Sequence, residues 1–466
     1  MSVKPRELTL SVEDVRKVQR SSKLDVESLK NDDESVSEVP YVDYRPDGLS
    51  ARSTLINFLK GMVGPGSLSL PLALKQGGLI AGATLIIILG FINNYCMLQL
   101  VQSSQHLSRK KGRVLDYGTV AYESCAMSFR SLRRYRYAFK FFCNGSIVAL
   151  QLGICSVLCV FLLEHIRQIA EHTGFHLSTV TWNCIVLAPL ILSNIVRTLR
   201  NLVVLSIVGN ICISGALLYV IQYLIRQPHE LTNLPYFTSV DGVLVAACTV
   251  LYSYEGQALI LPMENKIRSP TKMLGTFGVI SQGMFFITII YTLSAFLGYA
   301  TYGQDVKGSI TLNLPESTET LVIKCIFMLT AYAGFGIQQY VIVDMTWPWI
   351  RDKLGLSGQT GLIRDHLPEA GYRTCLLMFE LMIAIVVPTL DELIPCVGAS
   401  VGMLLALAFP VIIHTLTFAP EWSGKCQLTW NLSRNLFVLT IGLVVGTAGL
   451  KFNISQIIQQ HFSHSS

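Results

Sequence analysis

Charge is what this 466-residue sequence has least of. Only 14% of its residues are charged, whereas 51% are hydrophobic. A soluble globular domain has roughly 25% charged residues, so there is too little charge here to coat a water-soluble globule of this length. The formal net charge of +6 is also small for a nucleic-acid-binding protein. The composition therefore argues against a soluble fold, and we expect no nucleic-acid partner.

The sequence also lacks the patterns of several other protein classes. Residues 1–50 are polar and mixed in charge, without the apolar core that a cleaved signal peptide needs. The twelve cysteines lie mostly in apolar segments, and their spacing indicates neither a disulfide framework nor a metal site. No nucleophile motif, metal-ligand cluster or acid–base pair typical of an enzyme is evident. We therefore expect neither catalysis nor a bound cofactor.

What the sequence does contain is a series of apolar runs, each about as long as a membrane-spanning helix, which needs about 20 residues. The expected spans lie near 53–76, 79–101, 138–163, 179–196, 201–225, 242–262, 274–300, 319–344, 372–389, 392–416 and 434–455. The ninth and tenth spans are separated only by a turn at Leu390 and Asp391. The predicted fold is an all-α polytopic membrane protein of about eleven transmembrane helices in a lipid bilayer.

Lysine and arginine orient these spans, because they are concentrated in the loops that follow the even-numbered ones. The positive-inside rule places those loops and the N-terminus in the cytosol, and eleven spans then put the C-terminus in an extracellular or lumenal space. We expect a disordered cytosolic tail over residues 1–50, a transmembrane domain over 51–456 and a short C-terminal tail over 457–466. Asn453 begins a potential glycosylation sequon close to the membrane.

Two of the spans cannot be straight helices. The first contains the run GMVGPG at residues 61–66, and the sixth contains YSYEG at residues 252–256, followed by Pro262. Backbone groups freed at membrane depth need partners in protein or in a watery cavity. Broken helices at matching positions of two oppositely oriented halves are typical of a transporter's binding site. We therefore predict a 5+5 inverted repeat, with broken helices 1 and 6 and an appended eleventh helix. Kinks that only allow close packing are the alternative.

The two breaks together predict a site for an amino acid. Amide groups at Gly66, Ser67 and Leu68 begin the second half-helix, and with the helix dipole they would bind a carboxylate. Freed carbonyl groups of both breaks would accept hydrogen bonds from the ammonium group, while Tyr252 and Ser253 would limit the size of the side chain. The predicted substrate-binding residues are Gly64, Gly66, Ser67, Leu68, Tyr252, Ser253, Glu255 and Gly256.

Several segments resemble a known family. Residues 59–71, the pair Glu255-Gly256, the segment LPMEN at 261–265 and the segment KGSITLNLP at 307–315 are similar to the proton-assisted amino acid transporters, within the amino acid/auxin permease superfamily. The resemblance covers roughly residues 46–455. It implies a transporter of small neutral amino acids, such as glycine, alanine and proline, that is usually driven by protons.

Two positions depart from that family. Vertebrate members often have a histidine linked to proton dependence in the first span, where this sequence has Asn57. Members also tend to have a disulfide-forming cysteine just after the Asn-Leu-Pro segment, where this sequence has Glu316 and Ser317. Proton coupling therefore has to be argued from other residues.

Ionisable residues at membrane depth are costly and usually functional. Glu255 is the predicted proton carrier, and the alternative is a carboxylate that only caps freed amides. Lys60 occupies a position where sodium-coupled members of the superfamily place an asparagine among the sodium ligands, so its ammonium would repel sodium. The alternative is a lysine that extends to the cytosolic interface. Asn57, Lys60 and Glu255 are the predicted ion-coupling residues, whereas Glu380 and His414 are expected at the membrane interface.

The predicted function is sodium-independent, proton-coupled transport of small neutral amino acids. The alternative is an amino acid sensor of the lysosomal membrane with little transport flux. The sequence leaves both the plasma membrane and the lysosomal or endosomal membrane open as the location, because it contains no convincing sorting signal.

Overall fold

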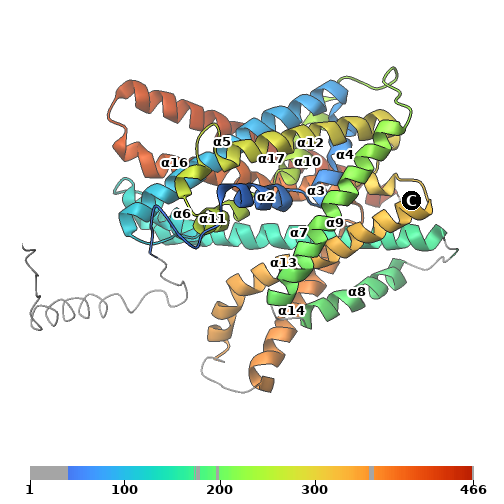
Figure 1. Cartoon of the computed structure of the whole chain (residues 1–466), viewed down its shortest axis with the longest axis horizontal. Coiled ribbons are helices and arrows are strands. Elements are labelled where there is room, and N and C mark those ends of the chain that lie inside the picture. The colour runs from blue at the N-terminus through green and yellow to red at the C-terminus, as the bar shows by residue number, and fades with distance from the viewer. Residues whose placement is uncertain (1–39, 173, 175–178, 196–198, 356–361, 464–466) are drawn as a thin grey trace, which may run out of the picture.

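The computed structural model describes residues 40–172, 174, 179–195, 199–355 and 362–463. Within these ranges the chain is helical, and its only β-type pairings are two isolated bridges. The helices pack into one elongated bundle, with long helices such as α7 (Arg136–His172) running along its length (Figure 1). The predicted all-α class is confirmed.

Seven helical segments in the described part of the chain are long and apolar enough to cross a membrane. They are α5 (Leu79–Lys111), α7, α10 with α11 (Val240–Ser253 and Gln257–Lys266), α12 (Val279–Tyr302), α13 (Thr318–Lys353), α15 with α16 (Leu390–Val397 and Phe409–Phe418) and α17 (Lys425–Ser463). The other predicted spans correspond to α2, α3 and α4 (Ala51–Met62, Pro65–Leu68 and Leu70–Gly77), α8 (Thr179–Ile195), α9 (Leu199–Arg226) and α14 (Leu362–Val386). A polytopic membrane protein is thus supported, and the count of eleven stays a prediction.

Two predicted boundaries were wrong. The seventh span begins at Val279, not near residue 274, because a 3₁₀ turn and Gly275, with a φ of 94°, separate it from α11. The turn between the ninth and tenth spans lies at residues 387–389 rather than at Leu390 and Asp391. Pro388 stops the preceding helix, and Asp391 then falls in the first turn of α15, where a carboxylate suits the helix dipole.

The tenth span contains an irregularity that the sequence did not reveal. Two π-helical turns, Gly398–Gly402 and Leu404–Ala408, join α15 to α16. The first packs against α10, and a Cβ atom on Gly398 would lie 2.1 Å from the carbonyl oxygen of Cys248. Only glycine permits this approach. A wide turn is therefore fixed directly beside the sixth span.

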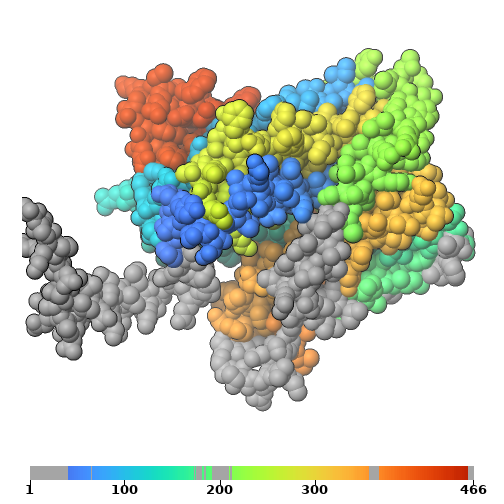
Figure 2. All heavy atoms as spheres, viewed as in Figure 1, coloured from blue at the N-terminus to red at the C-terminus, as the bar shows by residue number. Residues whose placement is uncertain are grey.

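One end of the bundle carries clustered arginines and lysines at residues 109–111 and 133–136 and is here called the basic end. The first described residues of the chain are hydrogen-bonded to this end. The Tyr41 amide donates to the Gly112 carbonyl at 3.0 Å, and Arg45 Nη1 donates to the Glu264 carbonyl at 2.6 Å. These residues, in dark blue, lie on the surface beside the yellow-green residues of α11 (Figure 2). Within the predicted tail over residues 1–50, residues 40–50 are thus docked, and residues 1–39 lie outside the described part.

The last helix changes two expectations at the other terminus. α17 continues to Ser463, so the helix extends past residue 456, where we expected the C-terminal tail to begin. Asn453 is 1% exposed, and its Nδ2 donates to the Glu392 carbonyl at 2.7 Å. A glycosyltransferase cannot reach a side chain buried between α17 and α15. The sequence left glycosylation of Asn453 open, and its burial argues against it.

Candidate substrate site at the two helix breaks

Both predicted helix breaks are present. In the first span α2 ends at Met62, and Gly64 is extended before the short helix α3 begins at Pro65. In the sixth span α10 ends at Ser253 and α11 begins at Gln257. Glycine and proline interrupt the helical hydrogen bonds at the first break, and glycine does so at the second. The two interrupted spans lie against each other, because α10 packs on α3 and α4.

Side chains from neighbouring helices satisfy the backbone carbonyls that the breaks leave free. The Ser253 hydroxyl lies 2.7 Å from the Gly66 carbonyl and 2.9 Å from that of Thr249. The Tyr291 hydroxyl, on α12, lies 2.7 Å from the Met62 carbonyl and 3.1 Å from the Ser253 carbonyl. Each hydroxyl has one proton and can donate to one of its two acceptors at a time. Tyr291 therefore joins both breaks through a single group.

The second break has a further partner on α5. Asn93 Nδ2 donates to the Tyr254 carbonyl at 2.8 Å, and Asn93 Oδ1 accepts from Gln257 Nε2 at 2.8 Å. Asn93 is fully buried, so both ends of its amide are used without water. Sequence reasoning missed both Asn93 and Tyr291. Asn93 is followed by Asn94 and Tyr291 by Thr292, and no spacing pattern shows which polar side chain of each pair faces the breaks.

Glu255 differs from these satisfied groups. Both of its carboxylate oxygens are buried, and within the described part of the chain neither has a hydrogen bond of normal geometry. The nearest donors are the amides of Gln257 and Ala258 at the start of α11. No described cation forms an ion pair with it. A buried, unpaired carboxylate is expensive, whereas a protonated or ligand-paired one is much cheaper. The position therefore suits a group that binds a proton or a cationic ligand.

The glycines of the predicted site fall into two kinds. A Cβ atom on Gly66 would lie 3.0 Å from Ser253 Cα, and one on Gly256 would lie 2.2 Å from Met62 Sδ. These two glycines let the interrupted spans approach each other. Gly64 is different, since a Cβ atom there would meet nothing within 4 Å. Of the three, only Gly64 leaves open space where a ligand could reach the backbone.

The predicted carboxylate site is altered in one respect. We expected the Ser67 amide to be free, but it donates to the Gly64 carbonyl at 3.0 Å, and the Ser67 hydroxyl donates to the same oxygen at 2.6 Å. The Ser67 amide is therefore used within the first turn of α3 and is not free to bind a carboxylate. Leu68 and Tyr252 are buried, and the Tyr252 ring lies against Gly66. The binding roles of all the predicted residues stay predictions.

The structure places the other two predicted ion-coupling residues on α2. Lys60 is half-buried in the last turn, where a cation suits the helix dipole, and within the described residues it forms no ion pair. Asn57 is exposed three residues earlier. No hydrogen bond of the described residues connects either of them to Glu255. Their coupling roles also stay predictions.

Two residues that we expected at the membrane interface are buried instead. Glu380 is fully buried on α14, which packs against α7, and both carboxylate oxygens lack a hydrogen-bond partner among the described residues. His414 is 8% exposed on α16, and its Nδ1 lies 3.3 Å from the side-chain amides of Gln99 and Asn435. Neighbouring helices cover both positions, which distance from a helix end does not reveal, and their depth relative to the membrane stays a prediction.

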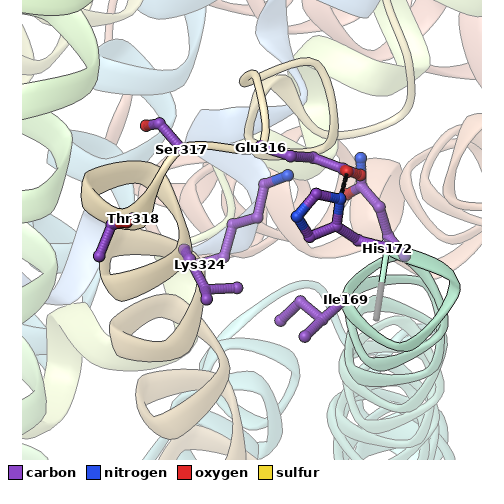
Figure 3. Close-up of a pocket in the computed structure, with 8 residues that line it drawn as sticks. Ile169, His172, Glu316, Ser317, Thr318 and Lys324 are labelled. Atoms are coloured by element: carbon purple, nitrogen blue, oxygen red, sulfur yellow. Dashed lines mark ion pairs between the residues drawn. The ribbon is translucent and has the colours of Figure 1, made fainter. Parts of the chain in front are cut away.

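A small cavity lies at the end of the bundle opposite the basic end, between the end of α7 and the start of α13 (Figure 3). Its volume is about 120 Å³. Glu316 forms an ion pair there with His172, and Lys324 Nζ donates to the Leu314 carbonyl at 3.1 Å. Glu316 stands where the resembling family tends to have a cysteine. The eleven cysteines whose side chains are described are all free, and an ion pair links α7 to this loop instead.

Comparison with known proteins agrees with this arrangement. Residues 47–455 match the family described as transmembrane amino acid transporter protein. A Caenorhabditis elegans protein named "Probable amino acid transporter skat-1" is 31% identical over 421 residues, which cover 89% of this chain and 91% of that protein. A Drosophila melanogaster protein named "Proton-coupled amino acid transporter-like protein pathetic" is 29% identical over 433 residues, covering 90% and 88%. This chain therefore belongs to the transmembrane amino acid transporter family.

Proposed function

We propose that this protein is a sodium-independent, proton-coupled secondary transporter of small neutral amino acids. The observation that carries the proposal is Glu255, a buried carboxyl without a hydrogen-bonded or charged partner among the described residues, placed at the break in the sixth span. Family membership supports amino acid transport in general. The Drosophila relative is named as a proton-coupled amino acid transporter-like protein, which supports the proposed use of protons.

The proposed mechanism uses the two breaks as one site. The amino acid carboxylate binds near Gly64, the position with open space beside the backbone. The ammonium group binds the Met62 and Ser253 carbonyl oxygens, which retain a lone pair when Tyr291 donates to them. A proton on Glu255 removes the buried charge, and the site then changes its exposure from one side of the membrane to the other.

Substrate size and ion choice follow from residues near the breaks. Tyr252 is buried against Gly66, so the space beside the two backbones suits a small side chain. The Lys60 ammonium, one turn before Gly64, would repel a sodium ion bound at the first break. The proposed substrates are therefore glycine, alanine and proline, with protons in place of sodium.

Uptake by purified protein in liposomes tests the proposal. With an inward proton gradient and sodium-free buffer, labelled glycine, alanine and proline are expected to accumulate, and adding sodium is expected to change nothing. Protein-free liposomes control for leak. Failure of all three amino acids to accumulate would refute the proposed substrates. Accumulation that requires sodium and ignores pH would refute the proposed coupling. Binding without flux would favour the sensor.

A further inference from the structure

The largest of the cavities described here lies at the basic end, between α5, α16 and α17, away from the two helix breaks. Its volume is about 410 Å³. Among the described residues that line it, four have basic side chains and none has a carboxylate. The basic ones are His106, Arg109, His414 and Arg434, and the others are Gln102, Gln105, Leu274, Phe418, Trp422 and Asn431. His106 pairs with Glu421 and Arg109 pairs with Asp43, so among the described basic residues of the lining Arg434 is the arginine left for an anion.

Arg434 is the arginine of this lining that has no carboxylate partner among the described residues. It lies nine residues after the start of α17, about 13 Å along the helix. Its guanidinium stacks on the Tyr95 ring at 4.8 Å and lies 3.4 Å from Asn431 Oδ1. Within the described part of the chain no carboxylate pairs with it, although Arg109 pairs with Asp43. Arg434 is exposed and stands where the predicted eleventh span begins, so its guanidinium is accessible to an anion at the membrane boundary.

A buried polar network holds the wall of this cavity. The Tyr95 hydroxyl donates to Asn435 Oδ1 at 2.8 Å, and Gln99 Nε2 donates to the same oxygen at 2.8 Å. Both Gln99 and Asn435 direct amide groups at His414 Nδ1. Because Nδ1 accepts, the proton of the neutral ring is on Nε2, which is left as a donor. The cavity is thus a preformed set of donors on three packed helices.

The surface beside the cavity indicates where the anion comes from. Downstream of the cavity, α17 exposes large apolar side chains, with Leu436 57% and Phe437 65% exposed. Trp430 is 67% exposed one turn before Arg434, and tryptophan favours the boundary between lipid headgroups and acyl chains. The turn between α16 and α17 lies at the same end of the bundle as α6 (Tyr117–Met127) (Figure 1). A ligand here would have a polar head and an apolar tail.

We propose that the cavity lined by Arg109, Arg434 and His414 binds the phosphate headgroup of an anionic membrane phospholipid, whose acyl chains lie along the exposed apolar face of α17. The Arg434 guanidinium offers paired donors to phosphate oxygens, whereas Arg109 lines the cavity and donates from Nε and Nη2 to Asp43. Basic pockets between transmembrane helices at the cytosolic side commonly hold such headgroups. This lipid site is separate from the amino acid site, so either proposal can fail without the other.

Native mass spectrometry and lipid titration of the purified full-length protein test the proposal. A short-chain phosphatidylinositol phosphate is expected to bind in preference to phosphatidylcholine. Arg434→Gln is expected to weaken that binding about fivefold, the effect of one basic residue near a membrane surface. Arg434→Lys is expected to bind with intermediate affinity, since it keeps the charge and loses the paired geometry. Arg351→Gln, which removes an exposed charge on α13, is expected to bind like the unchanged protein.

Two outcomes would overturn the lipid site. Equal lipid affinity of the unchanged protein and Arg434→Gln, with Arg434→Gln still eluting as a monodisperse folded protein, would show that the cavity does not bind the headgroup. Competition by inositol trisphosphate or inorganic phosphate at the affinity of the intact lipid would assign the cavity to a soluble anion. Amino acid uptake in phosphatidylcholine liposomes provides an independent test of folding, because the lipid measurement does not depend on transport.

Discussion

The two helix breaks are built from similar parts and differ in what they leave unsatisfied. At the first break, Tyr291 on α12 binds the Met62 carbonyl, and Ser253 on α10 binds the Gly66 carbonyl, which also accepts from Ser69. At the second break, Asn93 and Tyr291 bind the Tyr254 and Ser253 carbonyls, while the Glu255 carboxylate has no hydrogen-bond partner among the described residues. The side chains that bind the first break are thus uncharged, whereas the second break carries a carboxyl that forms no ion pair among the described residues.

The difference assigns separate tasks to the two breaks. Neutral, open backbone at Gly64 suits the recognition of a zwitterion, which needs donors and acceptors rather than net charge. A carboxyl without an ion-pair partner suits the binding and release of a proton. Its charge is costly when it is deprotonated, and the proton removes that charge. Tyr291 touches both breaks, so binding at one can influence the geometry of the other. Substitutions at each break should therefore have different signatures.

The largest effect is expected from Glu255→Gln. The amide keeps the shape of the side chain and cannot carry the proton, so uptake driven by a proton gradient should fall to the level of protein-free liposomes. Exchange of internal for external amino acid should persist, because exchange needs no net proton movement. The unchanged protein should gain uptake as the outer pH falls, and the variant should not. Retention of pH-driven accumulation would remove Glu255 from the proposed mechanism.

Asn93→Leu is expected to have the next largest effect. It leaves the Tyr254 carbonyl and the Gln257 amide without one partner each, and a buried polar group that loses its partner costs about 1–3 kcal/mol. The thermal midpoint of the detergent-solubilised protein should fall clearly. Asn57→Leu, at an exposed position on α2, is the matched control and should leave the midpoint almost unchanged. Equal midpoints for the two variants would contradict the supporting role of Asn93.

Gly66→Ala and Gly64→Ala separate packing from ligand access. The added methyl group at Gly66 would press on the Ser253 backbone, so the two breaks must shift by a few tenths of an ångström and both stability and transport should decrease. At Gly64 the methyl group has room and the backbone is extended, so stability should hold while the apparent substrate affinity decreases. Paired melting curves and uptake kinetics provide the measurement. Identical behaviour of the two variants would show that Gly64 does not face the substrate.

Ser253→Ala is expected to reduce stability less than Asn93→Leu does. One neutral hydrogen bond contributes about 0.5–1.5 kcal/mol, and Tyr291 can still approach the break through the Ser253 carbonyl. Transport should decrease only a few-fold. The double variant with Tyr291→Phe tests coupling, because the Tyr291 hydroxyl donates to the Ser253 carbonyl and residues in contact should show non-additive changes in thermal midpoint. Strict additivity would mean that the two breaks act independently.

Several parts of this molecule could be predicted from local sequence. Glycine and proline interrupt helices wherever they fall in this combination, so the breaks at Gly64 and Gly256 follow from covalent chemistry alone. Long apolar runs identify membrane helices because the bilayer leaves few other structures available. The predicted end of the ninth span was three residues too late. Hydropathy continues to residue 389, but Pro388 ends the helix at Val386.

The partners of the broken helices could not be predicted in this way. Tyr291 lies 229 residues from the Met62 carbonyl that it binds, and Asn93 lies 161 residues from Tyr254. Which face of a span points inward depends on how all the helices pack, and a uniformly apolar span has no periodic polar face to reveal it. The same reason explains why Glu380 and His414 were placed at the interface by sequence and are buried in the fold.

The sequence by itself therefore determined that the chain is an α-helical membrane protein, that its first and sixth spans are interrupted, and that Glu255 stands at the second interruption. Only the tertiary structure decided that the two interruptions meet, that Tyr291 joins them, and that Glu255 is left without a partner among the described residues. Whether a helix is interrupted depends on residues adjacent in sequence. Whether a buried polar group finds a hydrogen-bond partner depends on side chains from helices distant in sequence.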